Sequence, residues 1–218
     1  MKKDVARLEN MTDLSSVIKH AQITIVGDSD LVLNQMNARN IRTLIAPDRK
    51  AIREQPNMWE DLITAIHWRD PLPMQDTYTE SNEDMMKKLL AENAPCITTF
   101  GLKKSFGQTV VRTGTDKYST SFDASLNVSA PNGLVPVKFA GWAYQEKLMS
   151  PKRGAPICVV LNHFMGWEAT FQIDYMEGVY SRDKLIDIIN LAGFSIGIGS
   201  GRTSGYGRYH VTDVKMVG

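Results

Sequence analysis

The feature that most constrains this chain is a glycine-rich stretch near its C-terminus. Six of the 16 glycines lie between residues 193 and 207, together with Arg202 and followed by Arg208. Glycine adopts positive φ without steric cost and leaves backbone N–H groups uncovered. Such a stretch therefore predicts a loop that lies directly against a phosphate, a nucleic-acid backbone or another main chain. The glycines alone leave these three partners open.

The composition is that of a globular protein of 218 residues, 43% of them hydrophobic and 22% charged. A net charge of +1 excludes a uniformly basic protein, so a nucleic-acid surface would have to come from local clustering of Lys and Arg. Cys96 and Cys158 lie far apart and form no C-x-x-C pair, which fits a reducing compartment. No segment approaches the roughly 20 apolar residues of a membrane span, and the N-terminus lacks a signal peptide's apolar run. We therefore expect a cytoplasmic protein that does not contact membranes.

Hydrophobic periodicity predicts the order of the elements. The segments with the pattern of a strand are 22–26, 31–33, 135–140, 157–162, 167–175 and 207–216. Those with helical spacing are 37–67, a helix opened by Ser81, 100–112, and a helix capped by Ser181 and ended by Gly193. The small polar residues of 113–133 predict a mobile loop. A strand–helix–strand unit at each end, with antiparallel strands between, predicts an α+β fold with a ferredoxin-like antiparallel sheet.

The helix predicted at 100–112 has two distinct faces. Leu102, Phe106 and Val110 repeat every four residues and predict a buried stripe. The opposite face carries Lys103, Lys104, Gln108 and Arg112. This basic face is either an ordinary solvated surface or a surface that binds phosphates.

Several short motifs match enzyme patterns only in part. Gly193–Gly197 satisfies G-x-S-x-G, but the predicted helix precedes the serine, whereas a nucleophile elbow needs a strand there. The loop has no lysine for a phosphate-binding P-loop, and Arg202 stands where the third glycine of a dinucleotide fingerprint belongs. The four histidines show no metal-ligand spacing. We therefore expect no catalytic residue, no metal and no cofactor.

Other blocks of the sequence resemble a known family. Gly197-x-Gly199 and Gly205-Tyr-Gly207-Arg208, followed by a strand, resemble the C-terminal signature of the RAMP superfamily, which includes the Cas7, Cas5 and Cas6 proteins of CRISPR systems. Residues 102–112 resemble the "s-LKgalR" helix of its Cas7-like members, and 23–31 is similar to their first strand and turn. The chain resembles still more closely a set of short uncharacterised phage and prophage proteins, in the blocks 25–33, 167–175 and 192–211.

The resemblance implies a ferredoxin-like, RRM-related single domain, with insertions at about 37–95 and 113–155. It also implies a non-catalytic, phage-encoded protein of the host cytoplasm that binds single-stranded RNA, or less readily DNA, and forms a homo-oligomer or filament along the strand. Tyr206 and Tyr209 would offer faces on which bases stack. The expected nucleic-acid-binding residues are Lys103, Lys104, Arg112, Gly197, Gly199, Gly201, Arg202, Gly205, Tyr206, Gly207 and Arg208.

Two other functions stay open. One is a Cas6-like, metal-independent endoribonuclease in which His20 or His67 acts as general base. The other is a phage assembly or anti-defence protein that kept the fold without binding nucleic acid. In that protein the glycine loop would pack against another subunit.

Overall fold

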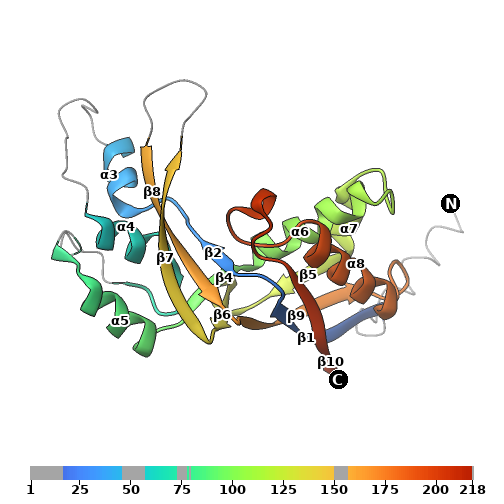
Figure 1. The fold of residues 1–218 in the computed structure, drawn as a ribbon. Coiled ribbons are helices and arrows are strands. Elements are labelled where there is room, and N and C mark those ends of the chain that lie inside the picture. The colour runs from blue at the N-terminus through green and yellow to red at the C-terminus, as the bar shows by residue number, and fades with distance from the viewer. Residues whose placement is uncertain (1–16, 46–56, 73–77, 79, 150–156, 218) are drawn as a thin grey trace, which may run out of the picture.

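The computed structural model describes residues 17–45, 57–72, 78, 80–149 and 157–217 (Figure 1). Its main sheet has the path β10-β1-β9-β6-β4-β3, and β5 also pairs with β9. The ferredoxin-like part consists of β1 (Ile18–Gly27), α6 (Thr99–Arg112), β5 (Leu126–Ser129), β9 (Glu168–Met176), α8 (Arg182–Ser195) and β10 (Tyr209–Val217). These strands are antiparallel neighbours in the order β10-β1-β9-β5. This is the β-α-β-β-α-β arrangement of a ferredoxin-like fold, so the predicted fold class is confirmed.

The alternation of buried and exposed residues along the central strands shows which face of this sheet is covered. In β9 the residues predicted to face inward, Ala169, Phe171, Ile173 and Tyr175, are all buried. In β1, Ile23 is buried and lies opposite Phe171 in the register. One residue along, Thr24 and Thr170 point to the other face and their hydroxyls hydrogen-bond at 3.0 Å. The sheet thus has one apolar face and one polar face.

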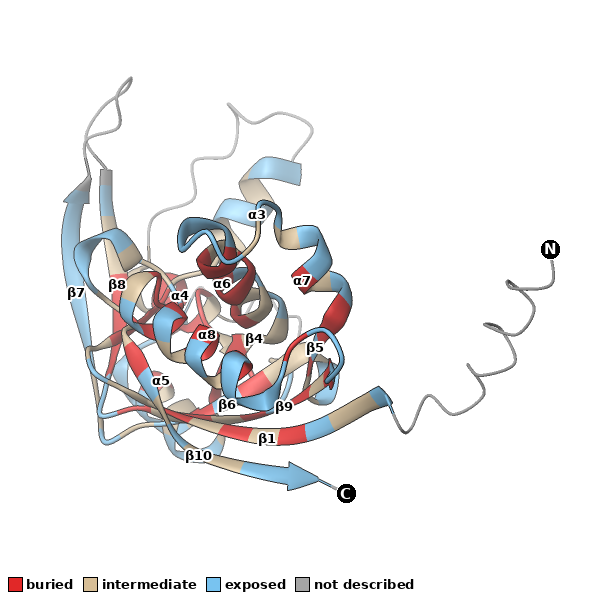
Figure 2. Ribbon diagram, turned by 90° about the vertical axis from the view of Figure 1, so that its right-hand side faces the viewer, coloured by how far each residue is buried: buried red, intermediate tan, exposed pale blue. Residues whose placement is uncertain are grey.

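Helices α6 and α8 both cover the apolar face (Figure 2). Phe106 of α6 packs on Phe171 with ring centroids 6.1 Å apart. The four residues predicted to face inward on α8, namely Leu185, Ile188, Ile189 and Ala192, are buried. Ser181 caps α8 as predicted, accepting from Lys184 N. In both helices, the apolar face predicted from the sequence is therefore the face that packs against the sheet.

The first insertion runs between β1 and α6. It contains β2 (Leu31–Leu33), α3 (Ala38–Ile45), α4 (Met58–Thr64), β3 (His67–Trp68), α5 (Glu83–Glu92) and β4 (Pro95–Thr98). Residues 46–56 of the predicted helical segment 37–67 lie outside the described residues. In its described part the pattern corresponds to α3 and α4, and its last residue belongs to β3. Asn82, and not Ser81, caps α5, because the Asn82 side chain accepts from Met85 N. Ser81 is instead buried beside Met85.

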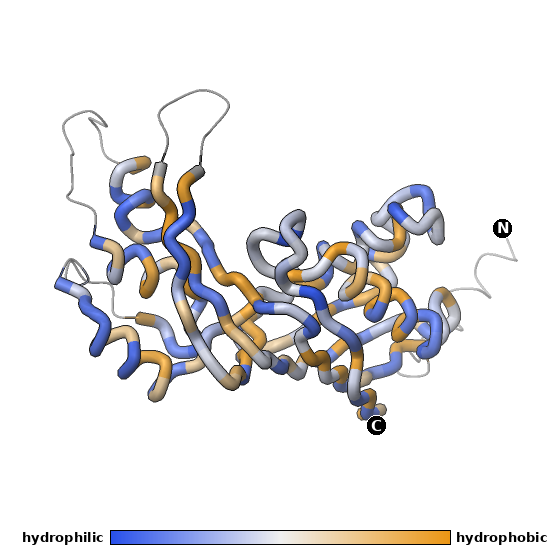
Figure 3. Tube along the Cα trace, in the orientation of Figure 1, coloured by the Kyte–Doolittle hydropathy of each residue, from blue (hydrophilic) through white to orange (hydrophobic). Residues whose placement is uncertain are grey.

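The second insertion runs between β5 and β9. It contains β6 (Leu134–Lys138), β7 (Gly141–Met149) and β8 (Ile157–Met165), and β2, β8 and β7 form a separate three-stranded sheet. The hairpin of β7 and β8 stands away from the ferredoxin-like part (Figure 1). Its outer strand β7 is hydrophilic in the middle, at Gln145 to Lys147 (Figure 3). Residues 150–155 of the predicted insertion at about 113–155 lie outside the described residues.

The prediction of a mobile loop at 113–133 is wrong. This segment contains α7 (Ser119–Ser125), β5 and a short 3-10 helix, η2 (Pro131–Gly133). Phe122, Leu126 and Val128 are buried in the core, and Phe122 packs edge-on against Tyr180 at 5.4 Å. The segment therefore packs into the core through three apolar side chains, although its composition is otherwise that of a loop.

The end of α8 also differs from the prediction. Gly193 lies inside the helix, where a Cβ would stand 1.9 Å from the carbonyl oxygen of Tyr209. The helix ends two residues later, at Ser195. Gly197 has φ +74° and donates its N–H to Ala192 O, so it is the left-handed residue that terminates the helix. Gly193 is needed for close packing of α8 on β10.

No helix in the described part of the chain is long and apolar enough to cross a membrane.

Candidate functional site

The glycine loop packs mainly against the chain's own backbone. Ile198 N donates to Gly207 O at 3.0 Å, and Gly207 N donates to Asp30 O at 2.8 Å. A Cβ at Gly207 would lie 1.9 Å from Ile198 O, and one at Gly199 would lie 2.5 Å from Val32 O. Gly199 and Gly207 thus lie directly against the backbone of other segments of the same chain. Main chain was one of the three partners that the sequence left open for this loop. The N–H groups of Gly197 and Gly207 are used within the fold, so neither can be presented to a ligand as predicted.

The remaining part of the loop is exposed. Gly199, Gly201 and Gly205 are solvent-exposed and have positive φ. Within the described residues, the N–H groups of Gly199 and Gly201 have no hydrogen-bond acceptor. Arg202 extends from this part of the loop. These groups keep the predicted ability to contact an anion.

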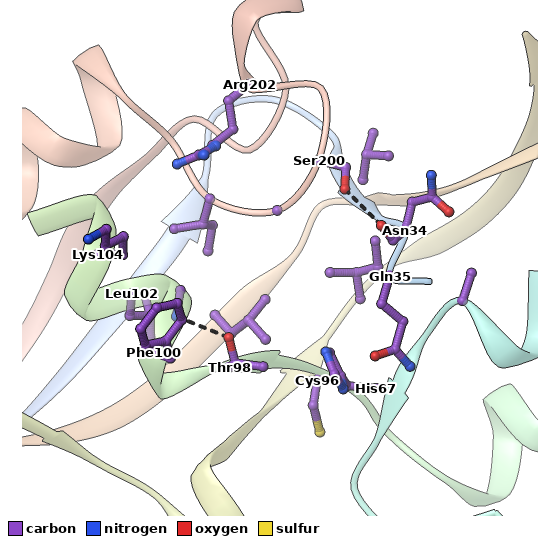
Figure 4. Close-up of a pocket in the computed structure, with 17 residues that line it drawn as sticks. Asn34, Gln35, His67, Cys96, Thr98, Phe100, Leu102, Lys104, Ser200 and Arg202 are labelled. Carbon is purple, nitrogen blue, oxygen red and sulfur yellow. Dashed lines mark hydrogen bonds between the residues drawn. The ribbon is translucent and has the colours of Figure 1, made fainter. Parts of the chain in front are cut away.

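Helix α6 brings its basic face to the same place. Thr98 caps the helix by accepting from Gly101 N at 3.0 Å. Leu102, Phe106 and Val110 are buried as predicted. Ser105, also buried, donates to Gly197 O at 3.0 Å and so fixes α6 against the start of the glycine loop. One residue before it, Lys104 is exposed on the side that faces Arg202 (Figure 4).

Between these elements lies a cleft of about 270 Å³. Lys104 and Arg202 stand at its mouth, on α6 and the glycine loop respectively (Figure 4). Phe100, in the first turn of α6, also lines the cleft with a side chain that is 74% exposed. The cleft is lined by Val32, Leu33, Asn34, Gln35, Ala65, His67, Cys96, Ile97, Thr98, Phe100, Gly101, Leu102, Lys104, Ile198, Gly199, Ser200 and Arg202.

The deep end of the cleft holds three polar side chains. Gln35 donates from Nε2 to Thr64 O at 3.2 Å and to Ile66 O at 3.0 Å. Burial lowers the pKa of His67 below its ordinary value of 6.5, so this imidazole is uncharged at neutral pH. Burial raises the pKa of the Cys96 thiol to about 11. The deep end therefore carries no charge, and both cations lie at the mouth.

The structure does not bring all of the predicted basic residues together. Arg112 lies two turns along α6 from Lys104, in a second groove that also contains Asp123 of α7. Lys104 lines both hollows, so Arg112 lies on a continuation of the cleft. Lys103 is half-buried and lines neither.

Two further predicted residues have partners inside the fold. The Arg208 guanidinium donates to Phe194 O at 2.7 Å and to Arg202 O at 3.4 Å, which ties the end of α8 to the loop. The Tyr206 ring packs edge-on against His163 at 5.0 Å. Tyr209 is 1% exposed, so it offers no face for stacking. Phe100, which the sequence pattern did not mark, is the exposed aromatic ring at the cleft.

Pairing of charges distinguishes the cleft from the polar face of the sheet. On that face Lys138 pairs with Glu168 at 3.2 Å and Lys215 pairs with Asp213 at 3.0 Å. His20 contacts Asp174 there at 2.7 Å. By contrast, no carboxylate of the described residues lies within ion-pair distance of Lys104, Arg202, Lys103 or Arg112. The central strands also place no aromatic ring on the polar face, where β1 and β9 carry residues such as Gln22, Thr24, Thr170 and Gln172. The cleft is therefore the better surface for an anionic partner.

Comparison with known proteins gives structural likeness without sequence similarity. No protein-family model matches the sequence, and no curated protein matches it. The fold is similar to that of a chain in the cryo-EM structure of the Type III-B Cmr-beta bound to cognate target RNA, with a TM-score of 0.46 and 10% sequence identity. The match covers 99% of this chain and 66% of that chain, so this protein spans slightly less than two thirds of its length. The likeness is one of distant fold.

Within the described residues no group of three or more His, Cys, Asp or Glu side chains is placed to hold a metal ion.

Proposed function

We propose that this protein binds single-stranded nucleic acid, RNA in preference to DNA, through the cleft between α6 and the glycine loop. The observation that carries the proposal is the position of Lys104 and Arg202 at the mouth of a cleft that also exposes Phe100. Neither cation has a carboxylate partner among the residues that the structure describes. Lysine and arginine bind phosphates, and an exposed aromatic ring stacks on bases of any sequence. The free N–H groups of Gly199 and Gly201 add donors for phosphate oxygens.

The proposal includes a homo-oligomer along the strand, as the resemblance to Cas7-like proteins implies. Strand β7 supports it, because in the described sheet β7 pairs with β8 on one side and has no strand partner on the other. A free edge of nine residues offers backbone groups to a second copy of the chain. Electron micrographs of the protein with and without a long single-stranded RNA test this part, and particles that stay monomeric on RNA would contradict it.

Binding is best measured by fluorescence anisotropy with labelled 20-nucleotide RNA, the same sequence as DNA, and the corresponding duplexes, over a range of salt concentrations. We expect the single strands to bind more tightly than the duplexes, RNA more tightly than DNA, and affinity to fall steeply with salt. Phe100→Ala should weaken binding by about tenfold, in line with the stacking of one base. Phe194→Ala is the matched control, because Phe194 is an exposed aromatic residue of α8 that lines neither the cleft nor its continuation. Absence of binding to any polynucleotide would favour the assembly or anti-defence alternative.

One observation favours the endoribonuclease as a second candidate. Of the two histidines considered from the sequence, His20 lies on the opposite face beside Asp174, whereas His67 lines the cleft. Its uncharged imidazole could accept a proton from a ribose 2′-hydroxyl. Incubation of labelled RNA with the protein in the presence of a chelator tests this function. Cleavage that is lost in His67→Gln would support it, and intact RNA after prolonged incubation would exclude metal-independent cleavage of that substrate.

A further inference from the structure

The floor of the cleft fixes the orientation of one amide group. The Gln35 side chain reaches two carbonyl oxygens, Thr64 O and Ile66 O, which can only accept hydrogen bonds. The amide nitrogen must therefore face them, and both of its hydrogens are used. The Gln35 backbone N–H also donates to Ala65 O at 2.9 Å, so the residue is held at three points along residues 64–66.

These three hydrogen bonds give Gln35 Oε1, a hydrogen-bond acceptor, a fixed orientation. Within the described residues no donor hydrogen-bonds to Oε1. In the close-up it points toward the interior of the cleft, on the side of His67 and Cys96 (Figure 4). A partly buried acceptor that has no protein partner favours a ligand that brings a donor to it.

The rest of the cleft suits a flat aromatic ligand. Its walls are apolar side chains from three separate segments, among them Leu33, Ile97 and Ile198. The cations stand at the mouth, where a phosphate attached to such a ligand would lie. A nucleobase combines a flat apolar body with hydrogen-bonding groups on its edge, and it carries its phosphate at the opposite end.

We propose that the cleft receives one base of the bound strand and that Gln35 Oε1 accepts a hydrogen bond from an exocyclic amino group of that base. The inference rests on the proposed function and adds base preference to it. Cytosine presents an amino group where uracil presents a carbonyl oxygen, at the same size and shape. A carbonyl placed against Oε1 would leave both acceptors unpaired, so uracil should bind this position more weakly than cytosine.

The test compares the affinity of the unmodified protein for oligo(C) and oligo(U) of equal length at the same salt concentration. We expect oligo(C) to bind on the order of tenfold more tightly, which is the effect of one hydrogen bond with a penalty for its unpaired alternative. Tight binding of both without preference would overturn the inference and leave the proposed function standing. Failure of both to bind would overturn the proposed function, and the inference with it.

A protein variant checks the assignment to Gln35. Gln35→Met keeps the length of the side chain but removes the acceptor, so the ratio of the two affinities should fall to about one. Gln172→Met is the matched control, because Gln172 is exposed on the polar face of the sheet, in β9 and away from the cleft. A preference for oligo(C) that persists in a folded Gln35→Met protein would overturn the assignment. If that variant does not fold, the unmodified protein is tested with an oligonucleotide of 4-deoxy pyrimidine, which lacks the amino group. Its affinity should fall below that of oligo(C), and equal affinities would overturn the inference.

Discussion

The Ser105 hydroxyl donates a hydrogen bond to the carbonyl oxygen of Gly197 at 3.0 Å, across 92 residues of sequence, and both residues are buried. The neighbours of these two residues include Lys104 on α6 and Gly199 on the loop. The bond therefore fixes the two sides of the cleft relative to each other.

Ser105→Ala should lower the free energy of unfolding by about 1–3 kcal/mol, because it leaves the buried Gly197 carbonyl without this donor. Urea denaturation followed by circular dichroism measures the change. Ser195→Ala is the control, since the Ser195 hydroxyl donates to Leu191 O within its own helix at an exposed position. We expect a change within about 0.5 kcal/mol for that variant. Equal effects of the two substitutions would show that the Ser105 bond contributes nothing specific.

Substitutions at Gly205 and Gly207 allow the cost of backbone strain to be measured apart from the cost of close packing. Gly205 has φ +89°, and a Cβ added there would meet no other atom within 4 Å, so Gly205→Ala should cost only the left-handed strain, about 1–2 kcal/mol. Gly207 has φ +69° and a Cβ there would lie 1.9 Å from Ile198 O, so Gly207→Ala should cost considerably more. Thermal unfolding of the two variants side by side measures this difference. Similar melting temperatures would mean that the loop is not packed as described.

Loss of a phosphate contact should alter the salt dependence of binding. Lys104→Gln and Arg202→Gln should each make the plot of log affinity against log salt less steep by about 0.7, the contribution of one phosphate contact on a single strand. Lys138→Gln removes the same charge from the polar face of the sheet, where Lys138 pairs with Glu168. Its slope should equal that of the unmodified protein. If all three variants change the slope equally, the effect is one of net charge, and the cleft is not the binding surface.

The two cysteines should differ strongly in reactivity. Burial raises the pKa of the Cys96 thiol to about 11 and its side chain is inaccessible, whereas Cys158 is exposed. At pH 8 one thiol per chain should react rapidly with a disulfide reagent, and the second only after denaturant is added. Cys158→Ser should abolish the rapid phase. Rapid reaction of both thiols in the native protein would contradict the packing of Cys96 in the core.

His67 should make stability depend on pH. Because burial lowers its pKa below 6.5 in the folded state, the unfolded chain binds more protons in that pH range. The contribution of neutral His67 to stability is therefore present above pH 6.5 and is lost as the pH falls through the folded-state value. The difference in unfolding free energy between the unmodified protein and His67→Gln should shift in favour of the variant between pH 7 and pH 5. A difference that stays constant over this range would show that His67 is solvated in the folded state.

The elements predicted well are those whose pattern is local. Strand β9 alternates over its whole length and α8 repeats at helical spacing, so the buried faces of both could be read directly from the sequence. Strand β5 escaped prediction because it has four residues, and its place in the sheet depends on pairing with β9 some 45 residues later. Gly193 was expected to end α8, but its contact with Tyr209 is a tertiary feature that no local signal carries.

The candidate site was predicted only in part for the same reason. The basic face of α6 and Arg202 of the loop could be recognised, because they follow from spacing and composition. Gln35 and His67 lie in the cleft because β2 and β3 bring them beside α6, and nothing in their immediate sequence marks them. Phe100 sits on the first turn of α6, two residues before the buried stripe begins, and its exposure could have been inferred from that phase.

The joint between the glycine loop and the segment around β2 is made from main chain on both sides: Ser200 N donates to Val32 O and Gly207 N to Asp30 O, each at 2.8 Å. Backbone atoms are common to every residue type, so this joint places little demand on which side chains occupy residues 30–32 beyond their fit to the core. It demands instead that the facing glycines keep no side chain at all. Over evolutionary time such a joint would let the surrounding sequence diverge while the architecture persists. A comparison of natural variants should therefore find the identity of the loop glycines retained where that of their β2 partners has drifted.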